Sequence, residues 1–205
     1  MKEIKELHDQ SLYLPNSQEI VVEQTKMLDL LFEYNSLAPS KKVEKERLLK
    51  EMFYSIGKNC YIETPFHSNF GGGNVIFGDN VYANFNLTLV DDTYIEVGNN
   101  VMFGPNVTLA TAGHPIEPSL RKKGYQYNAP ITIGDNVWIG ANTLVMPGVK
   151  IGENSVIGGG SVVTKDVPAN VVAFGNPCKV YRLIGEKDRK YYFKDKMIDE
   201  TLFKE

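Results

Sequence analysis

The sequence contains few of the residues that build disulfide scaffolds or membrane anchors. Its 205 residues include only two cysteines, Cys60 and Cys178, too few for a disulfide scaffold in a chain of this length, so we expect a reducing, cytoplasmic setting. No stretch approaches the ~20 apolar residues that a membrane-spanning helix needs. The first six residues, MKEIKE, are charged throughout and lack the apolar run of a signal peptide.

Strong charge and metal-binding motifs are also missing. The formal net charge is −3, so no bulk basic field is available to attract nucleic acid or a membrane surface. The glycines at 71–73 match neither the Walker nor the dinucleotide-binding pattern. The three histidines are scattered, and neither they nor the cysteines show metal-ligand or nucleophile spacing, so we expect no catalytic metal.

What the chain does contain is a repeat of six residues. From Ile133 to Val163 every sixth residue is β-branched and aliphatic, and glycine follows four of these six anchors. A strand repeats every two residues and a helix every ~3.6, whereas a period of six with an aliphatic anchor is typical of a parallel β-helix. We expect the anchors to point into a narrow core and the glycines to permit a positive φ at the corners. The anchors are Ile133, Ile139, Val145, Ile151, Ile157 and Val163.

The same phase runs through the preceding part of the chain, with two interruptions. Its anchors are Phe77, Ala83, Leu89, Val97, Phe103 and Leu109. Two extra residues fall within 91–94, where we expect Asp91 and Asp92 to project from the coil. They would accept hydrogen bonds from sugar-like hydroxyls, orient a base, or form only a solvated turn. The second interruption, 113–130, keeps the phase and is expected to be a long loop thrown out of one corner, since such loops are usually functional.

The chain therefore divides into three parts. Residues 1–55 form a helical segment, with helices expected near 17–37 and 40–54 and Ser40 as the N-cap of the second. Residues 56–180 form the β-helix with its extruded loop, and 181–205 form a charged, aromatic tail. Because the open strand edges at the ends of a coil invite aggregation, we expect the helical segment and the tail to cover them.

His114 is the leading candidate for catalysis. It stands between Gly113 and Pro115 at the root of the long loop, and Pro115 restricts it to extended backbone conformations. An imidazole fixed where a loop leaves a rigid scaffold is well placed for general base work, although it would also serve simply to cap the loop. We expect His8 to be a solvated surface residue and His67 to lie in a polar turn.

Other side chains fit either binding or a plain surface. Trp138 precedes an anchor, so it points outward as a subunit contact or as a platform for a flat ligand. Asn84 forms a corner or binds substrate. Three basic residues lie near the C-terminal end of the coil: Lys165, Lys179 and Arg182. They would bind phosphates if they stack in neighbouring turns, or else form a solvated face.

Several motifs together resemble those of the galactoside and maltose O-acetyltransferases, which are left-handed β-helix acyltransferases. They are YANFN at 82–86, VDD at 90–92, GHP at 113–115, PITIGDNVWIG at 130–140 and GNPCKV at 175–180. The resemblance covers nearly the whole chain. It implies a left-handed coil, a homotrimer with active sites between subunits, acetyl-coenzyme A as donor and a sugar as acceptor.

The resemblance also implies a role for particular residues. His114 matches the catalytic base. The acceptor-binding positions are Asn69, Tyr82, Asn84, Asp92 and Gln126. The coenzyme-binding positions are Trp138, Ala141, Gly159, Thr164, Lys165, Lys179 and Arg182.

The chain departs from the family pattern on the acceptor side. Residues 13–16, YLPN, lack the carboxylate that the family carries after an N-terminal aromatic residue. Gln24 stands where one branch has an arginine, and Gln126 where the galactoside branch has a methionine. These departures concern the acceptor, whereas the donor side is largely intact. From the resemblance we expect a galactoside, glucoside or maltose-like acceptor. The alternatives are an antibiotic, serine or a nucleotide-linked amino sugar as acceptor, or a non-catalytic β-helix scaffold.

Overall fold

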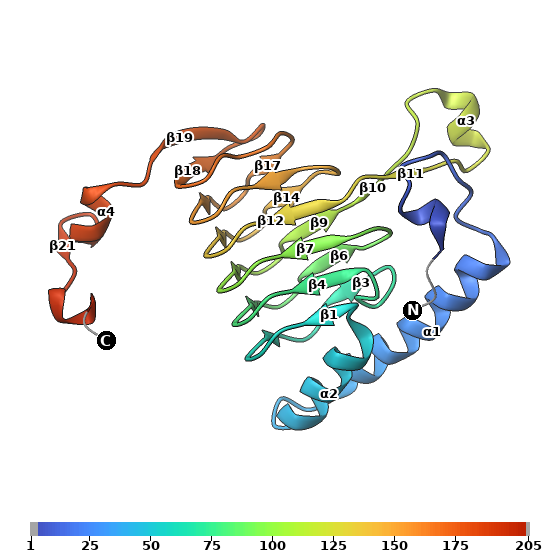
Figure 1. The fold of residues 1–205 in the computed structure, drawn as a ribbon, viewed down its shortest axis with the longest axis horizontal. Coiled ribbons are helices and arrows are strands. Elements are labelled where there is room, and N and C mark those ends of the chain that lie inside the picture. Colours follow the sequence, from blue (N-terminus) through green and yellow to red (C-terminus); the bar gives the residue numbers. More distant parts are fainter. Residues whose placement is uncertain (1–3, 204–205) are drawn as a thin grey trace.

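The computed structural model describes residues 4–203, and most of that chain forms one parallel β-helix whose short strands build three flat sheets (Figure 1). The first sheet contains β1 (Ser55–Ile56), β4 (Val75–Phe77), β7 (Ile95–Val97), β12 (Ile131–Ile133) and β15 (Lys150–Ile151). The second contains β2 (Tyr61–Ile62), β5 (Tyr82–Ala83), β8 (Met102–Phe103), β13 (Trp138–Ile139), β16 (Val156–Ile157), β18 (Val171–Phe174) and β19 (Lys179–Leu183). The third contains β3 (His67–Ser68), β6 (Thr88–Val90), β9 (Thr108–Ala110), β14 (Leu144–Val145) and β17 (Val162–Val163).

The repeat of six fixes the core, as predicted. Every anchor of the repeat is buried, none being more than 3% exposed. The parallel register stacks equivalent anchors of successive turns, so that Ile139 lies between Phe103 and Ile157. Each turn therefore adds one layer of aliphatic and aromatic side chains to a continuous hydrophobic core.

The corners work differently from the prediction. The glycines that follow the anchors do not adopt a positive φ; at the corners, asparagines do, for example Asn136 at 59° and Asn154 at 59°. Asparagine tolerates this left-handed conformation because its short polar side chain makes local hydrogen bonds. The glycine is needed for space instead. A Cβ on Gly140 would lie 2.5 Å from the backbone nitrogen of Gly159 in the next turn.

The asparagines of one corner form a ladder along the whole coil. Each side-chain amide donates to the amide oxygen of the asparagine in the following turn, at distances of 2.9 to 3.1 Å. The members are Asn59, Asn80, Asn100, Asn136, Asn154 and Asn170, and all six have φ between 57° and 60°. The ladder thus joins successive turns outside the sheets and satisfies the amides that the corner requires.

Two helices cover the N-terminal end of the coil, as expected. α1 (Gln18–Ser36) and α2 (Lys42–Met52) pack against each other, and their buried faces contact β3 and β1. The side chain of Ser17 caps α1. The predicted N-cap of the second helix is wrong, because the backbone N–H of Lys41 bonds to the carbonyl of Ala38 in a tight turn and α2 begins after it.

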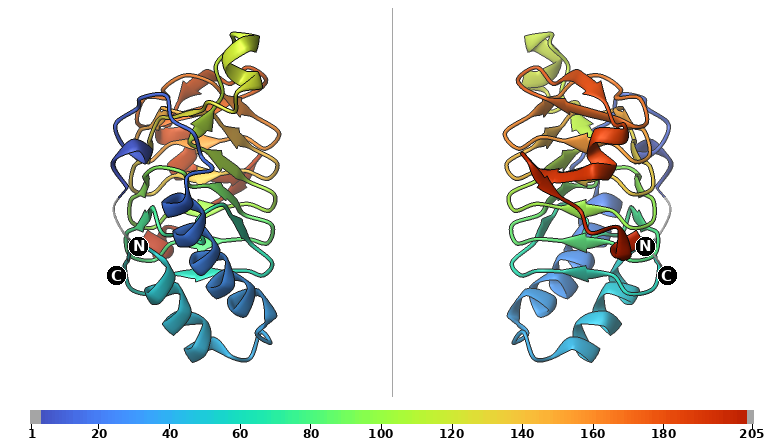
Figure 2. Two further views of the ribbon diagram at one scale, coloured as in Figure 1. Left: turned by 90° about the vertical axis from the view of Figure 1, so that its right-hand side faces the viewer. Right: turned by 90° about the vertical axis from the view of Figure 1, so that its left-hand side faces the viewer.

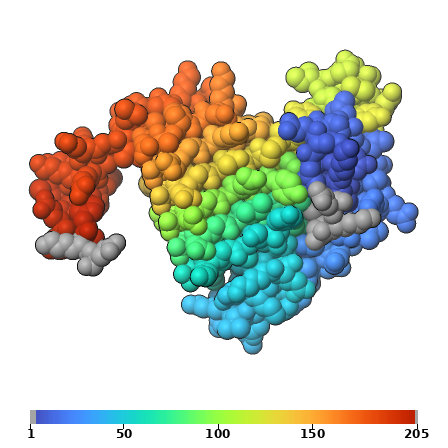
Figure 3. Space-filling view, in the orientation of Figure 1, coloured from blue at the N-terminus to red at the C-terminus, as the bar shows by residue number. Residues whose placement is uncertain are grey.

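The opposite end of the coil is covered by β19, which pairs antiparallel with β18. The rest of the tail leaves the coil and curls away from it, so only its first residues form the expected cover (Figures 1, 2 and 3). It contains α4 (Glu186–Lys190), β20 (Tyr191–Phe193), β21 (Lys196–Met197) and the short 3₁₀ helix η2 (Glu200–Phe203). Between residues 4 and 203, no helix has the length and apolar character to cross a membrane.

A pair of substitutions in the asparagine ladder separates its two roles. Asn136→Ala removes the polar side chain that makes the left-handed region tolerable, where an alanine costs up to roughly 1–2 kcal/mol for the backbone alone, and it also leaves the neighbouring ladder amides unpaired. Asn136→Gly removes the same amide without the backbone strain. We expect urea unfolding to show a clearly larger loss for alanine than for glycine; equal losses would contradict the conformational role of this corner.

Candidate active site

Extra residues leave the coil at the same corner in three neighbouring turns. β3, β6 and β9 are adjacent in the third sheet. Asn69 directly follows β3, the segment 91–94 follows β6, and the long loop follows β9 after a further two residues. Because parallel strands end at the same edge of a sheet, these three segments meet beside one another. Stacking of the coil thus assembles side chains that are far apart in the sequence.

The extruded loop has structure of its own. β10 (Ala112–Gly113) pairs antiparallel with β11 (Tyr127–Asn128), and the helix α3 (Pro118–Lys122) lies at the tip of the loop, which projects from the coil in Figure 1. His114 follows β10 directly. A short ribbon therefore holds the root of the loop, and the position of His114 is set by paired backbone rather than by a free turn.

One ring nitrogen of His114 is held by the returning segment of the loop, just before β11. Its Nδ1 lies 2.8 Å from the carbonyl oxygen of Tyr125. Since a carbonyl only accepts hydrogen bonds, Nδ1 carries the proton and Nε2 keeps its lone pair in the neutral ring. The imidazole is exposed on the surface of the chain. This arrangement presents a basic nitrogen to a ligand in a defined orientation.

The prediction that Asp91 and Asp92 project from the coil is wrong. Asp91 is completely buried and Asp92 is 5% exposed. The chain after β3 folds over Asp91, which accepts hydrogen bonds from the hydroxyl of Ser68 and from the backbone N–H groups of Phe70 and Gly72. Burial raises the pKa of Asp91 to about 6, against the lowering effect of these donors. Its role is to tie two neighbouring turns together.

Asp92 faces the site and is held from both sides. Asn69 donates its amide to one carboxylate oxygen at 2.8 Å, and Gln126 donates its amide to the other at 2.9 Å. Burial raises the pKa of Asp92, while these two hydrogen bonds and the charge of nearby His114 lower it. Four of the predicted site residues, His114, Asn69, Asp92 and Gln126, therefore meet at this corner.

Two other predicted acceptor residues lie on a different part of the chain. Tyr82 points outward from β5, with its hydroxyl 3.5 Å from Glu63, and burial raises the pKa of that hydroxyl. The side-chain oxygen of Asn84 accepts from the backbone N–H of Phe85. Within residues 4–203, no hydrogen bond connects Tyr82 or Asn84 to the corner around His114.

The outward face of the second sheet carries a continuous apolar stripe. The residues at equivalent positions of successive strands are Tyr61, Tyr82, Met102, Trp138, Val156 and Val172. Met102 and Trp138 are each about half exposed. The outward orientation predicted for Trp138 is confirmed, and contiguous apolar surface of this kind marks a contact region.

Five of the predicted coenzyme positions fall into two groups. Ala141 and Gly159 occupy stacked corners, where Gly160 donates to the carbonyl of Ala141, and a Cβ on Gly159 would lie 3.0 Å from that oxygen. Lys179 is brought beside the turn that carries Thr164 and Lys165, because the backbone N–H of Cys178 bonds to the carbonyl of Val162.

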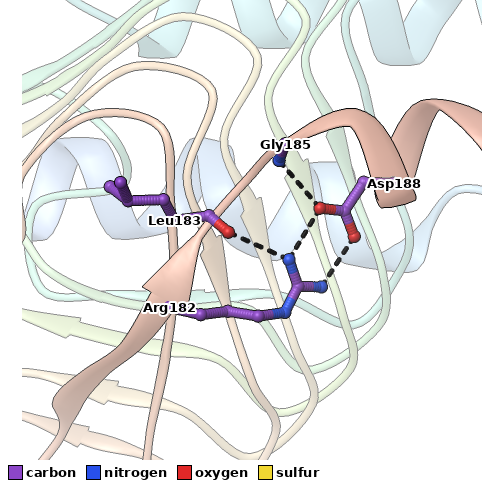
Figure 4. Close-up of polar contacts among 4 residues, drawn as sticks. All are labelled: Arg182, Leu183, Gly185 and Asp188. Carbon is purple, nitrogen blue, oxygen red and sulfur yellow. Dashed lines mark hydrogen bonds and ion pairs between the residues drawn. The ribbon is translucent and has the colours of Figure 1, made fainter.

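Arg182 is already paired within the tail. Its guanidinium donates to both carboxylate oxygens of Asp188 at 2.6 Å and to the carbonyl of Leu183 (Figure 4). The pair is partly exposed. The hydrogen bond from Arg182 holds the pKa of Asp188 down to about 2. A phosphate would therefore have to share this guanidinium with Asp188 or displace it.

The remaining histidines also depart from expectation. His8 is not simply a solvated residue: its Nδ1 lies 3.0 Å from the hydroxyl of Thr93, and its ring stacks on Tyr94. His67 lies in strand β3 rather than in a turn. In the part of the chain that the structure describes, no three histidine, cysteine or acidic side chains gather as a metal site would require.

Sequence reasoning missed four contributors to the site: Tyr13, Ser68, Tyr125 and Asn128. Tyr125 acts through its backbone carbonyl, which carries no signal in its residue type. Tyr13 bonds to residues more than one hundred positions away, so no local pattern could have indicated it. Ser68 precedes the glycine-rich turn, but nothing in the local sequence indicates that this turn folds over Asp91.

Comparisons with known proteins agree with this architecture. Residues 130–165 match the bacterial transferase hexapeptide (six repeats) family, and residues 9–57 match the maltose acetyltransferase hexapeptide capping motif. A galactoside O-acetyltransferase of Lactococcus lactis is 55% identical over 97% of this chain and 96% of its own length. One from Escherichia coli is 51% identical over 84% and 85% of the two chains. A solved galactoside acetyltransferase in complex with coenzyme A aligns with a TM-score of 0.91 at 46% identity, covering 93% of this chain and 95% of its own.

Fold and site together define an acetyltransferase of the hexapeptide-repeat class. The coil and its helical cap both match these relatives. Given identities of 55% over 97% of the chain and 51% over 84% of it, the chain belongs to the galactoside O-acetyltransferase family.

The buried carboxylate of Asp91 gives a test of how the site is supported. Asp91→Asn keeps the shape but turns an amide group toward backbone N–H donors, which should cost about 1–3 kcal/mol as an unsatisfied buried contact. Ser68→Ala removes only one donor and should cost less. Urea unfolding of both variants measures the difference. An Asp91→Asn protein as stable as the wild type would contradict the supporting role.

Proposed function

We propose that the protein transfers the acetyl group of acetyl-coenzyme A to a hydroxyl of a galactoside, glucoside or maltose-like acceptor, with His114 as general base. The observation that carries the proposal is the 2.8 Å contact between Nδ1 of His114 and the Tyr125 carbonyl, which leaves Nε2 available as the base, close enough to Asp92 for the two groups to interact electrostatically. The sugar class is supported by the relatives that are galactoside O-acetyltransferases.

The reaction needs no covalent intermediate on the protein. Nε2 of His114 takes the proton from the acceptor hydroxyl as its oxygen attacks the thioester carbonyl. The tetrahedral intermediate then collapses, the C–S bond breaks, and the imidazolium returns the proton to the coenzyme thiolate. The two free cysteines are poor nucleophiles, since burial raises the pKa of both Cys60 and Cys178. Free thiols of this kind also suit the cytoplasmic location that we propose.

Asp92 would hold the acceptor and stabilise the positive charge that develops on His114. Its carboxylate is preorganised by Asn69 and Gln126, so little reorganisation is needed when a sugar hydroxyl donates to it. Tyr82 and Asn84 would complete the acceptor pocket. The coenzyme would be bound by Trp138, Ala141, Gly159, Thr164, Lys165, Lys179 and Arg182.

A homotrimer with sites between subunits would bring these groups together. Tyr82 and Trp138 lie on the second sheet, whereas His114 projects from a corner of the third, so a second copy is a simple way to unite them. The apolar stripe of the second sheet provides a surface for that contact. The tail adds exposed apolar side chains such as Leu183 and Tyr192.

The role of His114 is tested by two variants. His114→Ala should lower kcat by at least ~10², the low end for loss of a general base, with little change in coenzyme affinity. His114→Asn can still donate to the Tyr125 carbonyl but cannot take up the proton, so it should be equally slow. Thiol release from acetyl-coenzyme A in the presence of a galactoside measures both. Near wild-type turnover in either variant would refute the mechanism.

We expect the enzyme to accept several sugars with similar efficiency. Strong selection requires charged groups that are left unpaired by a poor substrate, and residues 13–16 supply no carboxylate while Gln24 replaces an arginine. We expect galactosides, glucosides and maltose to have kcat/KM values within about tenfold, a spread of ~1.4 kcal/mol. Leu14→Asp should sharpen the preference. A panel in which one of these sugars exceeds the rest by several orders of magnitude would contradict this expectation.

The proposed homotrimer is tested by measuring the mass of the protein in solution. Sedimentation equilibrium should return about three times the chain mass of 23.0 kDa. Met102→Lys places a charge in the middle of the apolar stripe and should yield smaller, less active species. Glu96→Lys, on the outward face of the first sheet, is the matched control and should leave the mass unchanged. A fully active wild-type monomer would rule out shared sites.

A further inference from the structure

The N-terminal arm, residues 4–16, crosses the corner where the candidate site is built. It docks through a separate small hydrophobic cluster formed by Ile4, Leu7, Tyr13, Ile20 and Phe70. It is also held by His8, which bonds to Thr93 and stacks on Tyr94. The arm is therefore packed against the same insertion, 91–94, that carries Asp92.

Tyr13 joins this arm to the returning part of the extruded loop. Its backbone forms a reciprocal pair with Gln126, with N–H to carbonyl distances of 3.0 and 3.1 Å. Tyr125, whose carbonyl binds His114, is the residue directly before this pair. Pinning Gln126 to the arm consequently restricts the carbonyl that sets the orientation and the tautomer of the catalytic imidazole.

The hydroxyl of Tyr13 extends the connection to Asp92. It is 5% exposed as a residue and accepts hydrogen bonds from the side-chain amides of Gln126 and Asn128. The same Gln126 amide donates to Asp92 at 2.9 Å. Burial, together with the charge of Asp92, raises the pKa of Tyr13 to about 12, so the hydroxyl stays protonated and neutral.

We propose that Tyr13 is a positioning residue for acetyl transfer, holding the loop so that the Tyr125 carbonyl fixes His114 and the Gln126 amide fixes Asp92. This inference rests on the proposed function, because it assigns Tyr13 to the same site. Tyr13 would act on the reaction only through these two neighbours and not by touching the acceptor. Asn128 reinforces the connection by donating to the carbonyls of Leu7 and Asp92.

Tyr13→Phe is the variant of choice, since it keeps the ring in its hydrophobic cluster and removes only the hydroxyl. Long-range ¹H–¹⁵N spectra of the full-length protein report the tautomer of His114, and the signals of its three histidines are assigned with His114→Ala. We expect the wild type to show a single tautomer protonated at Nδ1. In Tyr13→Phe both ring nitrogens should shift toward the values of a tautomer mixture.

The kinetic signature should be confined to the acceptor. Leaving the Gln126 and Asn128 amides short of a partner should lower kcat/KM for the sugar by about tenfold, within the range for an unsatisfied buried group. KM for acetyl-coenzyme A should not change. Gln126→Leu keeps the backbone pair but loses the side-chain contacts to both Asp92 and the Tyr13 hydroxyl, so it should raise the acceptor KM and shift the His114 tautomer in the same direction as Tyr13→Phe.

Tyr34→Phe is the matched control for simple loss of stability. Tyr34 is fully buried, and its hydroxyl donates to the carbonyl of Ile62 at 2.7 Å, far along the chain from the loop. It should lower the melting temperature without affecting the tautomer or the sugar kinetics. If Tyr13→Phe behaves like Tyr34→Phe, losing stability alone, the proposal is overturned.

Failure of the proposed function would look different. A wild-type enzyme that acetylates no sugar in the panel would refute the acceptor assignment, yet the tautomer measurement would still decide whether Tyr13 positions His114. A Tyr13→Phe protein with the wild-type tautomer and wild-type kinetics would refute the positioning role even if sugars are good acceptors.

Discussion

The close stacking of one turn of the coil on the next is the constraint on which the rest of this protein depends. Neighbouring strands lie about 4.8 Å apart, and at positions such as Gly140 this spacing leaves no room even for a Cβ. Extra residues therefore cannot be absorbed within a turn and must leave the coil at a corner. The candidate site is built where three neighbouring turns do this side by side, so the stacking of the coil also sets the geometry of the candidate site.

The repeating parts of the fold could be predicted from the sequence, whereas contacts that occur only once in the molecule could not. The buried anchors could be read because every turn imposes the same demand on them. The role of the glycines after the anchors could not be predicted. A glycine permits both a positive φ and the close approach of another chain segment, and only the position of the next turn distinguishes the two roles. Asp91 was misplaced because nothing local shows that Ser68 and the following turn fold over it.

The same contrast applies to the site. His114 could be proposed as a candidate from its place at the root of a loop, and the resemblance to known acetyltransferases added Asp92 and Gln126 as candidates. The connections among them could not be read. Tyr13 and Asn128 are 115 residues apart in the chain, and the contact between them exists only because the arm returns across the coil. Such long-range polar contacts produce no periodic pattern in the sequence, so they can be recognised only in the folded structure.

The asparagine ladder has one further consequence. From Asn136 to Asn154 the step is 18 residues, the length of one undisturbed turn. Each turn begins and ends with the same asparagine-to-asparagine hydrogen bond, so the ladder itself does not limit the number of turns. Duplication of one such segment would extend it by a single strand spacing and leave each junction unchanged. Its length can therefore change by whole turns, and a turn added away from the candidate site would leave that corner unchanged.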